Sequence, residues 1–406
     1  QARARYQRAR ALLRGGSASA ARTELRALLA RHPRETEPAA DALFLLADLA
    51  TDEGRDVEAR AAFRDLATRY PGARRAPEAA FRAAIIAYVQ RNDAAAAREL
   101  DALRERWPSS GEATAAAYWA GRAYARMGDQ VRARAHWRDI LARDPNSYYA
   151  GRAAARLDTA GWKPPAARDD FPQVAEVTDA FRRADLLDSL GMDVEARLEY
   201  DRAVREADAS VDRLLATADA LRDRGLTSPA IGLGWRAIGK GAPADARTYR
   251  LVYPVAQREV IAAEARANRI EPALVAALIR QESSFNPRAT SRVGARGLMQ
   301  LMPSVGTSIA RAKGLPDWDP VLLYQPDVNV TLGVSHLRGL ISRYRGDLVR
   351  VFAAYNAGDS RVTRWNRKAG ADDPEVFVER IPYEETRDYV RILLRNREMY
   401  EALYEW

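Results

Sequence analysis

The sequence predicts an almost entirely α-helical protein: a repeated helical solenoid, then a second helical region, then a C-terminal, mainly α domain. A set of residues recurs about every 37 positions through the first 145 residues, which is typical of stacked helical repeats. Elsewhere apolar residues keep helical spacing, and no convincing run of alternating β-branched residues interrupts them. With 406 residues, 47% of them hydrophobic and 29% charged, the chain can bury a large core beneath a solvated surface.

The repeat in the N-terminal part has four registered copies, offset by 38, 37 and 37 residues. The copies are Gly16, Ala21, Leu25 and Pro33; Gly54, Ala59, Phe63 and Pro71; Arg91, Ala96, Leu100 and Pro108; and Gly128, Ala133, Trp137 and Pro145. We interpret each copy as two helices, with Gly at the turn, a small Ala where the helices cross, a large apolar residue facing the next unit, and Pro ending the second helix. The pattern resembles a tetratricopeptide-like solenoid; an unrelated bundle of amphipathic helices is the alternative. Looser copies follow at Gly191, Ala196 and Tyr200 and at Gly225 and Ala230.

Two breaks divide the remaining chain. Residues 161–172 contain three prolines among polar residues, and residues 239–244 are rich in Gly and Pro. We therefore expect three domains: residues 1–160 with the helical repeats, residues 161–250 as a second helical or linker domain, and residues 251–406 as the C-terminal domain.

Composition excludes several classes of function. The chain has no Cys, and its three histidines, His32, His136 and His336, are far apart, so neither a metal site nor a Ser-His-Asp triad is supported. We expect no cofactor. The net charge of +9 comes from Arg and Lys interleaved with Asp and Glu, which indicates a solvated helical surface and not a nucleic-acid site. No apolar stretch is long enough to span a bilayer. The start at Gln1, without an initiator Met or a signal sequence, suggests a processed or trimmed chain, and if it is exported, its targeting segment is missing.

One carboxylate stands out as a catalytic candidate. Glu282 follows the apolar run 272–279, and Val275 lies two turns before it, which places the carboxylate on or beside the buried face of a helix. Burial disfavours the charged form of a carboxyl group and raises its pKa, as a general acid working near neutral pH requires. The alternative is an ordinary surface glutamate in a last helical turn.

Three further blocks follow in order: Ser291 to Pro303, Ala353 to Gly358, and Phe377 to Val390. Together with the segment Arg280 to Pro287, they resemble the catalytic domain of the soluble lytic murein transglycosylases, over roughly residues 251–406. The resemblance implies a lysozyme-like, mainly α fold that acts on peptidoglycan glycan strands. It also implies a periplasmic or cell-envelope location and a monomer, with cell-envelope protein partners bound through the helical repeats.

The same resemblance assigns roles to individual residues. Glu282 takes the place of the single catalytic acid and base, and Ser291 that of the hydroxyl which orients Glu282 and the substrate's N-acetyl group. The remaining substrate-binding candidates are Gln300, Met302, Tyr355 and Asn356 in the glycan groove, with Glu379 and Tyr389 near the sugar and its peptide stem.

Most of these candidates also have a structural interpretation. Gln300 could cap local backbone, Met302 could fill core ahead of a helix begun by Pro303, and Asn356 with Gly358 could be a helix C-terminus. Gly294 and Gly297 could be turn residues or could bring backbone close to a sugar. Tyr355, flanked by alanines, has small neighbours that let its phenol reach the reacting centre, whereas His336 is expected to be part of a helix face.

Glycoside cleavage normally uses two carboxylates, but only Glu282 has a context that raises a carboxyl pKa. The other acids, Asp317, Asp319, Asp327 and Asp347, fall in loops or helix starts that are expected to be exposed. One carboxylate is sufficient if the N-acetyl oxygen of N-acetylmuramic acid attacks its own anomeric carbon, and the expected product is then a 1,6-anhydro end. The rival interpretations are a hydrolytic muramidase and a solenoid scaffold with a degenerate enzyme domain.

Overall fold

The computed structural model describes residues 1–167, 170–315 and 317–406. The described chain is helical throughout and has no β-strand; its only β pairing is two isolated antiparallel bridges, Thr290 with Arg296 and Arg296 with Leu301. Inter-residue contacts divide the chain into two compact units. The first comprises residues 1–162 and 356–391, and the second residues 163–355 and 392–406. The domain boundaries expected at residues 160 and 250 stay a prediction.

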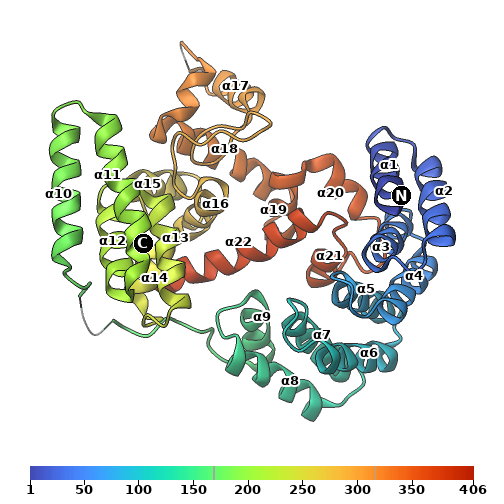
Figure 1. Cartoon of the computed structure of the whole chain (residues 1–406). Helices are drawn as coiled ribbons and strands as arrows, with labels where there is room; N and C mark the ends of the chain where they lie inside the picture. Colours follow the sequence, from blue (N-terminus) through green and yellow to red (C-terminus); the bar gives the residue numbers. More distant parts are fainter. Residues whose placement is uncertain (168–169, 316) are drawn as a thin grey trace. The chain divides into compact units, whose positions relative to one another are not determined.

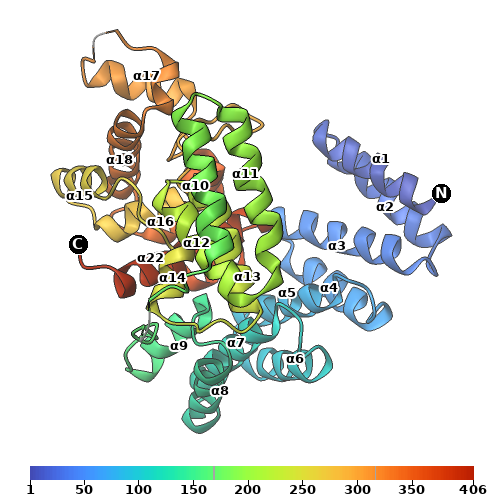
Figure 2. The same cartoon turned by 60° about the vertical axis from the view of Figure 1, so that its left-hand side comes forward.

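The first unit contains the predicted repeats as a series of paired helices (Figures 1 and 2). These are α1 (Ala2–Arg14), α2 (Ala18–Arg31), α3 (Thr36–Asp52), α4 (Asp56–Arg69), α5 (Ala76–Val89), α6 (Asp93–Arg106), α7 (Ala113–Arg126), α8 (Gln130–Arg143) and α9 (Tyr148–Leu157). Each repeat proline lies two residues beyond the last residue of the second helix of its pair, as in α2, which ends at Arg31 before Pro33.

The turn position of every repeat has left-handed backbone geometry. The φ angles are +80° at Gly16, +72° at Gly54 and +86° at Gly128, and the third copy holds Arg91 at +63°. Glycine adopts this conformation without a steric penalty, whereas a residue with a Cβ pays about 1–2 kcal/mol. The expected role of the turn position is therefore confirmed, including in the copy that lacks glycine.

The other repeat positions form the core between pairs. The four repeat alanines, among them Ala21 and Ala133, are completely buried, and so are Leu25, Phe63 and Leu100. Burying each large side chain stabilises the fold by about 1.5–3 kcal/mol. Two looser copies are also present as pairs in the second unit, α10 (Ala175–Ser189) with α11 (Asp193–Glu206) and α12 (Val211–Asp223) with α13 (Thr227–Gly239).

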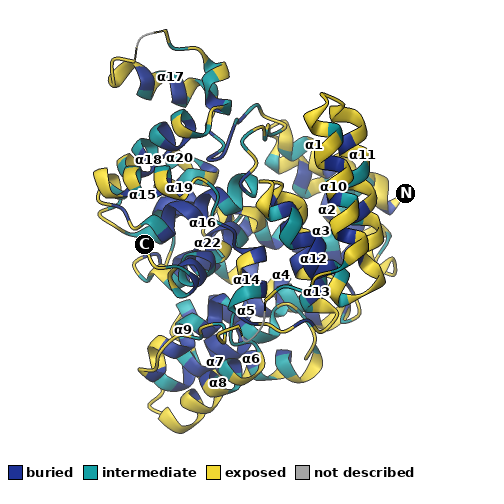
Figure 3. Ribbon diagram, turned by 90° about the vertical axis from the view of Figure 1, so that its left-hand side faces the viewer, coloured by how far each residue is buried: buried dark blue, intermediate teal, exposed yellow. Residues whose placement is uncertain are grey.

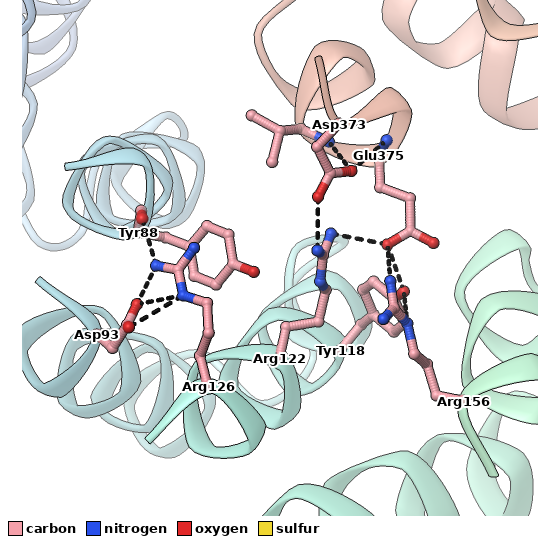
Figure 4. Close-up of polar contacts among 9 residues, drawn as sticks. Tyr88, Asp93, Tyr118, Arg122, Arg126, Arg156, Asp373 and Glu375 are labelled. Carbon is pink, nitrogen blue, oxygen red and sulfur yellow. Dashed lines mark hydrogen bonds and ion pairs between the residues drawn. The ribbon is translucent and has the colours of Figure 1, made fainter. Parts of the chain in front are cut away.

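A C-terminal segment completes the first unit. It includes α20 (Asp359–Trp365), α21 (Pro374–Glu379) and the start of α22 (Glu384–Leu403). Arg122 of α7 contacts Asp373 at 2.6 Å and Glu375 at 2.8 Å, and Tyr118 and Arg156 also bind Glu375 (Figure 4). Because these ions are partly buried and mutually bonded, losing one partner would leave charge uncompensated, which costs far more than breaking a surface ion pair.

The second unit carries the remaining helices. They are α14 (Ala246–Val252), α15 (Arg258–Ala267), α16 (Pro272–Ser283), α17 (Pro303–Ala312), α18 (Pro326–Arg343), the larger part of α19 (Leu348–Ala357) and the C-terminal part of α22, with two 3-10 turns at Ala207–Ala209 and Pro320–Tyr324. Helix α16 is buried along most of its length, whereas α10 and α11 expose long faces (Figure 3). No helix of the described residues combines the length and apolar character needed to cross a membrane.

Candidate active site

Helix α16 carries Glu282 in its last turn. Pro272 begins the helix, where its missing N–H costs nothing, and every residue from Ala273 to Ile279 is buried. The helix ends at Ser283, and Ser284 follows in left-handed geometry with φ of +52°. Glu282 itself is half-buried, beside the fully buried face that Val275 marks.

The end of α16 is fixed by hydrogen bonds to two other parts of the second unit. The Ser283 hydroxyl donates to the Leu298 carbonyl at 2.7 Å, and the Thr227 hydroxyl of α13 donates to the Ser284 carbonyl at 2.8 Å. Phe285 continues in left-handed geometry, with φ of +61°, and is buried. Two successive non-glycine residues in this region of φ/ψ space store strain that only surrounding packing maintains, and such strain is typical of functional sites.

The loop after α16 folds back on itself around Ser291 and Gln300. The Ser291 hydroxyl accepts from the Ala295 amide at 2.9 Å. The Gln300 side-chain amide donates to the Gly297 carbonyl at 2.9 Å and to the Ala289 carbonyl at 3.2 Å. The backbone-capping role considered for Gln300 is therefore present, while any contact between Gln300 and sugar stays a prediction.

The two glycines of this loop do different work. Gly294 has φ of +89° and open space beside it, so it is a turn residue. At Gly297 a Cβ would lie 2.0 Å from the Leu323 carbonyl oxygen and 2.3 Å from the Asn329 amide nitrogen. The close approach of backbone at Gly297 is thus to neighbouring protein atoms. Position 297 therefore requires glycine both because of this packing and because of its φ of +75°.

Asn329 of α18 anchors the same loop, and the sequence analysis missed it. It is completely buried, accepts from the Met299 amide at 2.7 Å, and donates to the carbonyls of Arg296 at 3.0 Å and Leu323 at 2.7 Å. The sequence feature that could have identified Asn329 is its amide side chain between Val328 and Val330, in an apolar helical segment. A polar group that is buried there needs hydrogen-bond partners.

Tyr355 of α19 is bonded to the loop and lies near Glu282. Its hydroxyl donates to the Met299 carbonyl at 2.7 Å, and its ring lies 5.2 Å from the ring of His336. Burial raises the pKa of Tyr355 well above its ordinary value, and the negative charge of Glu282 raises it further. The phenol is therefore a neutral donor close enough to Glu282 to sense its charge. Burial lowers the pKa of His336, so this ring, expected to be only part of a helix face, packs on Tyr355 as a neutral group.

Met302 is the last predicted site residue of the second unit, and its contact with substrate stays a prediction. Met302 is 38% exposed and precedes α17, which Pro303 begins as expected. The four other acids lie in loops or at helix starts, as expected. Asp317, Asp319 and Asp327 are exposed, whereas Asp347 is half-buried and pairs with Arg350. Asp319 accepts from the Val321 amide at 2.7 Å, which is a capping role.

Three predicted site residues belong to the first unit. Asn356 is exposed in the last turn of α19, and its side-chain oxygen accepts from the Thr386 hydroxyl at 2.6 Å. Tyr389 is buried in α22. Glu379, the last residue of α21, is also buried and is surrounded by donors of its own unit. It accepts from Trp119 at 3.2 Å and from Tyr149 at 2.8 Å, and pairs with Arg391.

Comparison with known proteins gives matches to a C-terminal segment and to two N-terminal segments of the sequence. A family model described as Transglycosylase SLT domain matches residues 259–378, and tetratricopeptide repeat models match residues 6–74 and 115–147. The soluble lytic murein transglycosylase of Salmonella typhimurium is 37% identical over 154 residues, which are 37% of this chain and 23% of that protein. That of Escherichia coli is 35% identical over 156 residues, 38% of this chain and 24% of that protein.

Solved structures extend the similarity beyond the aligned sequence. An inactive Glu-to-Gln mutant of the lytic transglycosylase Slt from Pseudomonas aeruginosa superposes with a TM-score of 0.75 at 25% identity, covering 96% of this chain and 62% of that one. The 70-kDa soluble lytic transglycosylase in complex with bulgecin A gives a TM-score of 0.76 at 22% identity, covering 98% and 62%, which supports the fold alone. The chain thus spans less than two thirds of these relatives. In sequence across its SLT segment, and in fold across nearly its whole length, the chain is similar to the soluble lytic murein transglycosylases.

Proposed function

We propose that the chain is a lytic transglycosylase that cleaves the β-1,4 bond between N-acetylmuramic acid and N-acetylglucosamine in peptidoglycan, leaving 1,6-anhydromuramic ends. The observation that carries this proposal is the position of Glu282. It lies inside the matched SLT segment, at the strained end of the buried helix α16, and its charge reaches Tyr355. Of the other acids considered, Asp317, Asp319 and Asp327 are exposed, and the half-buried Asp347 pairs with Arg350.

In the first step Glu282 acts as an acid. Its carboxyl proton passes to the glycosidic oxygen, and the N-acetylglucosamine side leaves as an alcohol. The N-acetyl carbonyl oxygen of the muramic acid attacks its own anomeric carbon as that bond breaks. An attacking group held on the same sugar has a high effective concentration, so no second protein carboxylate is needed.

In the second step Glu282 acts as a base. As a carboxylate it removes the proton from the C6 hydroxyl of the muramic acid, and the C6 oxygen bonds to the anomeric carbon and displaces the acetyl oxygen. Glu282 ends the cycle protonated, as it began, and no water is consumed. The half-buried setting of Glu282 suits a group that must be protonated in one step and ionised in the next.

The neighbouring residues supply position and hydrogen bonds. The Ser291 oxygen is already used as an acceptor, so its hydroxyl proton can be donated to the N-acetyl carbonyl. Tyr355 holds the Met299 carbonyl and thereby the loop that carries Gln300 and Met302, which we assign to glycan binding. The partly exposed thioether of Met302 can pack against a sugar face.

We also assign Asn356, Glu379 and Tyr389 to substrate binding, on family resemblance. The buried Glu379 is bonded to Trp119, Tyr149 and Arg391. Because these bonds fix the end of α21, Glu379 acts on substrate binding mainly by positioning that helix. The proposed substrate also places the protein in the periplasm or cell envelope, and envelope proteins remain the proposed partners of the helical repeats.

The test is digestion of purified sacculi by the full chain and by Glu282→Gln, with mass spectrometry of the products. The amide keeps the size of the side chain but can neither donate an acidic proton nor take one back. We expect anhydro ends from the unaltered chain and a loss of turnover of about a hundredfold or more in the variant. Reducing ends would establish hydrolysis instead, and no turnover by the folded, unaltered chain would favour a scaffold.

Matched Asp-to-Asn variants serve as controls for the single-carboxylate mechanism. Asp327→Asn removes a charge from the exposed first turn of α18, and Asp317→Asn, Asp319→Asn and Asp347→Asn do so in loops. Each should retain most activity. Loss of turnover in one folded Asp variant would identify a second catalytic carboxylate and overturn the mechanism.

A further inference from the structure

A surface cavity in the second unit has an arginine-rich wall that the proposed reaction does not use. Its volume is about 340 Å³. Its lining includes three arginines from three different helices, together with the start of α13 and a tyrosine that follows α22. These residues are Arg222, Arg250, Arg258, Thr227 and Tyr404. None of the predicted catalytic or substrate-binding residues lines it.

All three arginines line the cavity together with Tyr404, and the guanidinium carbon of Arg250 lies 5.9 Å from the centre of the Tyr404 ring. Burial raises the pKa of Tyr404 to about 12, and the charges that oppose this shift are Arg250, Arg222 and Arg258. No carboxylate is among the groups acting on this hydroxyl. The Tyr404 hydroxyl donates to the Tyr253 carbonyl at 2.7 Å, which fixes the ring in the cavity wall. The three positive charges therefore line one cavity.

Arg250 and Arg258 have positive charges that no carboxylate described by the structure neutralises, so they can attract an anionic ligand. Arg250 donates to the Leu403 carbonyl at 3.2 Å, and Arg258 donates to the Glu405 carbonyl. Within the described part of the chain, neither forms an ion pair with a carboxylate. Each bond to a neutral carbonyl leaves the positive charge uncompensated and most of the five N–H donors of a guanidinium unused.

Arg222 differs from the other two, because it pairs with Asp219 at 2.5 Å and with Asp223 at 2.8 Å. Its charge is thus largely compensated, and it contributes shape and a minor share of the field. Arg250 and Arg258 approach from α14 and from the first residue of α15, so their planar forks can bind different oxygens of one ligand. The N-terminus of α15 adds partial positive charge on the same side.

We propose that this cavity binds a phosphate group through Arg250 and Arg258. A tetrahedral, doubly charged oxyanion offers oxygens to both forks at once, whereas a carboxylate offers two oxygens in one plane. The cavity volume accommodates a phosphate ion, and its open side accommodates a phosphate attached to a larger molecule. Free phosphate and a lipid headgroup share this chemistry.

Isothermal titration of the full chain with sodium phosphate, at constant ionic strength, tests the site. The cavity variant is Arg250→Gln with Arg258→Gln. The matched control is Arg197→Gln with Arg205→Gln, which removes the same charge from exposed positions of α11. We expect saturable binding at one site, weakened at least tenfold in the cavity variant and less than twofold in the control. A wild-type titration without saturation, or equal weakening in both variants, overturns the proposal.

A second variant separates fork geometry from charge and from misfolding. Arg250→Lys with Arg258→Lys keeps both charges but loses the planar forks, so we expect binding between those of the wild type and the Gln variant. Phosphate affinity equal to that of the wild type would refute bidentate recognition. All variants should keep the wild-type unfolding temperature within about 2 °C, because both arginines are exposed.

Vesicle sedimentation identifies the source of the phosphate. If phosphatidylglycerol vesicles bind the wild type and the control but not the cavity variant, and phosphate competes with this binding, the site is supported with a lipid headgroup as its ligand. Equal vesicle binding by the cavity and control variants, together with loss of phosphate binding in the cavity variant, supports the site with free phosphate as ligand. Phosphatidylcholine vesicles give the uncharged baseline.

Discussion

Replacing Asn329 by Ala should destabilise the second unit severely, although the hydrogen bonds of Asn329 go to main-chain groups of Met299, Arg296 and Leu323 and not to a predicted site residue. The side chain is completely buried and makes three hydrogen bonds of 2.7, 3.0 and 2.7 Å to main-chain groups of two separate segments. In Asn329→Ala the Met299 amide and the carbonyls of Arg296 and Leu323 lose this partner. Each unsatisfied buried group costs about 1–3 kcal/mol, so the expected loss for the three groups is about 3–9 kcal/mol.

Thermal unfolding followed by circular dichroism measures this loss. For a unit of about 200 residues, 1 kcal/mol corresponds to about 2–4 °C, so the midpoint should fall by on the order of 10 °C. Asn268→Ala is the matched control: Asn268 is only partly buried, and its amide donates to a single carbonyl, that of Glu264 at 2.8 Å. It should cost no more than about 1 kcal/mol, because water can replace that bond.

Asn329→Asp distinguishes hydrogen-bond polarity from volume. The carboxylate has the same size and still accepts from the Met299 amide, but its second oxygen would face the two carbonyls to which the amide nitrogen donates. We expect it to be at least as destabilising as Asn329→Ala at pH 7. If either Asn329 variant unfolds within 2 °C of Asn268→Ala, the assignment of Asn329 as the anchor of the loop is refuted.

Three further predictions follow from the same contacts. Gly297→Ala should lower stability by at least 2 kcal/mol in chemical denaturation, because its Cβ would lie 2.0 Å from the Leu323 carbonyl oxygen; an unchanged midpoint would contradict the packing. Tyr355→Phe, which loses one partly buried hydrogen bond to the loop, should cost about 1 kcal/mol and reduce turnover on sacculi; unchanged stability and turnover together would remove Tyr355 from the site. Although burial opposes it, the bond from Arg122 holds the pKa of Asp373 below its ordinary value of 3.8. This depressed pKa contributes stability above about pH 4 that is lost as the pH falls through the folded value, so the stability gap between wild type and Asp373→Asn should shrink below pH 4; a gap that persists to pH 2 would contradict the linkage.

The helical repeats could be predicted from the sequence because each repeat position has a local cause. A left-handed turn favours glycine, a close helix crossing favours alanine, and a proline cannot continue a helix. These preferences act within a few residues, so they appear at a fixed period in the sequence. Arg91 is the exception, because it adopts a φ of +63° although arginine has no intrinsic preference for left-handed geometry. The packing of the flanking helices α5 and α6 imposes this geometry.

The candidate site was predicted only in part. The position of Glu282 at the end of a buried helix followed from the spacing of apolar residues, and its half-buried state is consistent with that spacing. The anchoring role of Asn329 did not follow, because its partners lie 6 to 33 residues away and a buried amide gives no indication of which backbone groups it binds. The contact of His336 with Tyr355 was missed for the same reason.

The sequence by itself therefore determined the helices, their turns, the repeat and the place of the candidate acid along the chain, because these depend on interactions between near neighbours. Only the tertiary structure decided which distant groups meet. Glu379 is bonded by Trp119 and Tyr149, which are 260 and 230 residues away, and Arg122 bridges to Asp373 across 251 residues. Such pairings depend on the summed packing of whole helices and on the cost of leaving buried charge unpaired. No local pattern of residues encodes them.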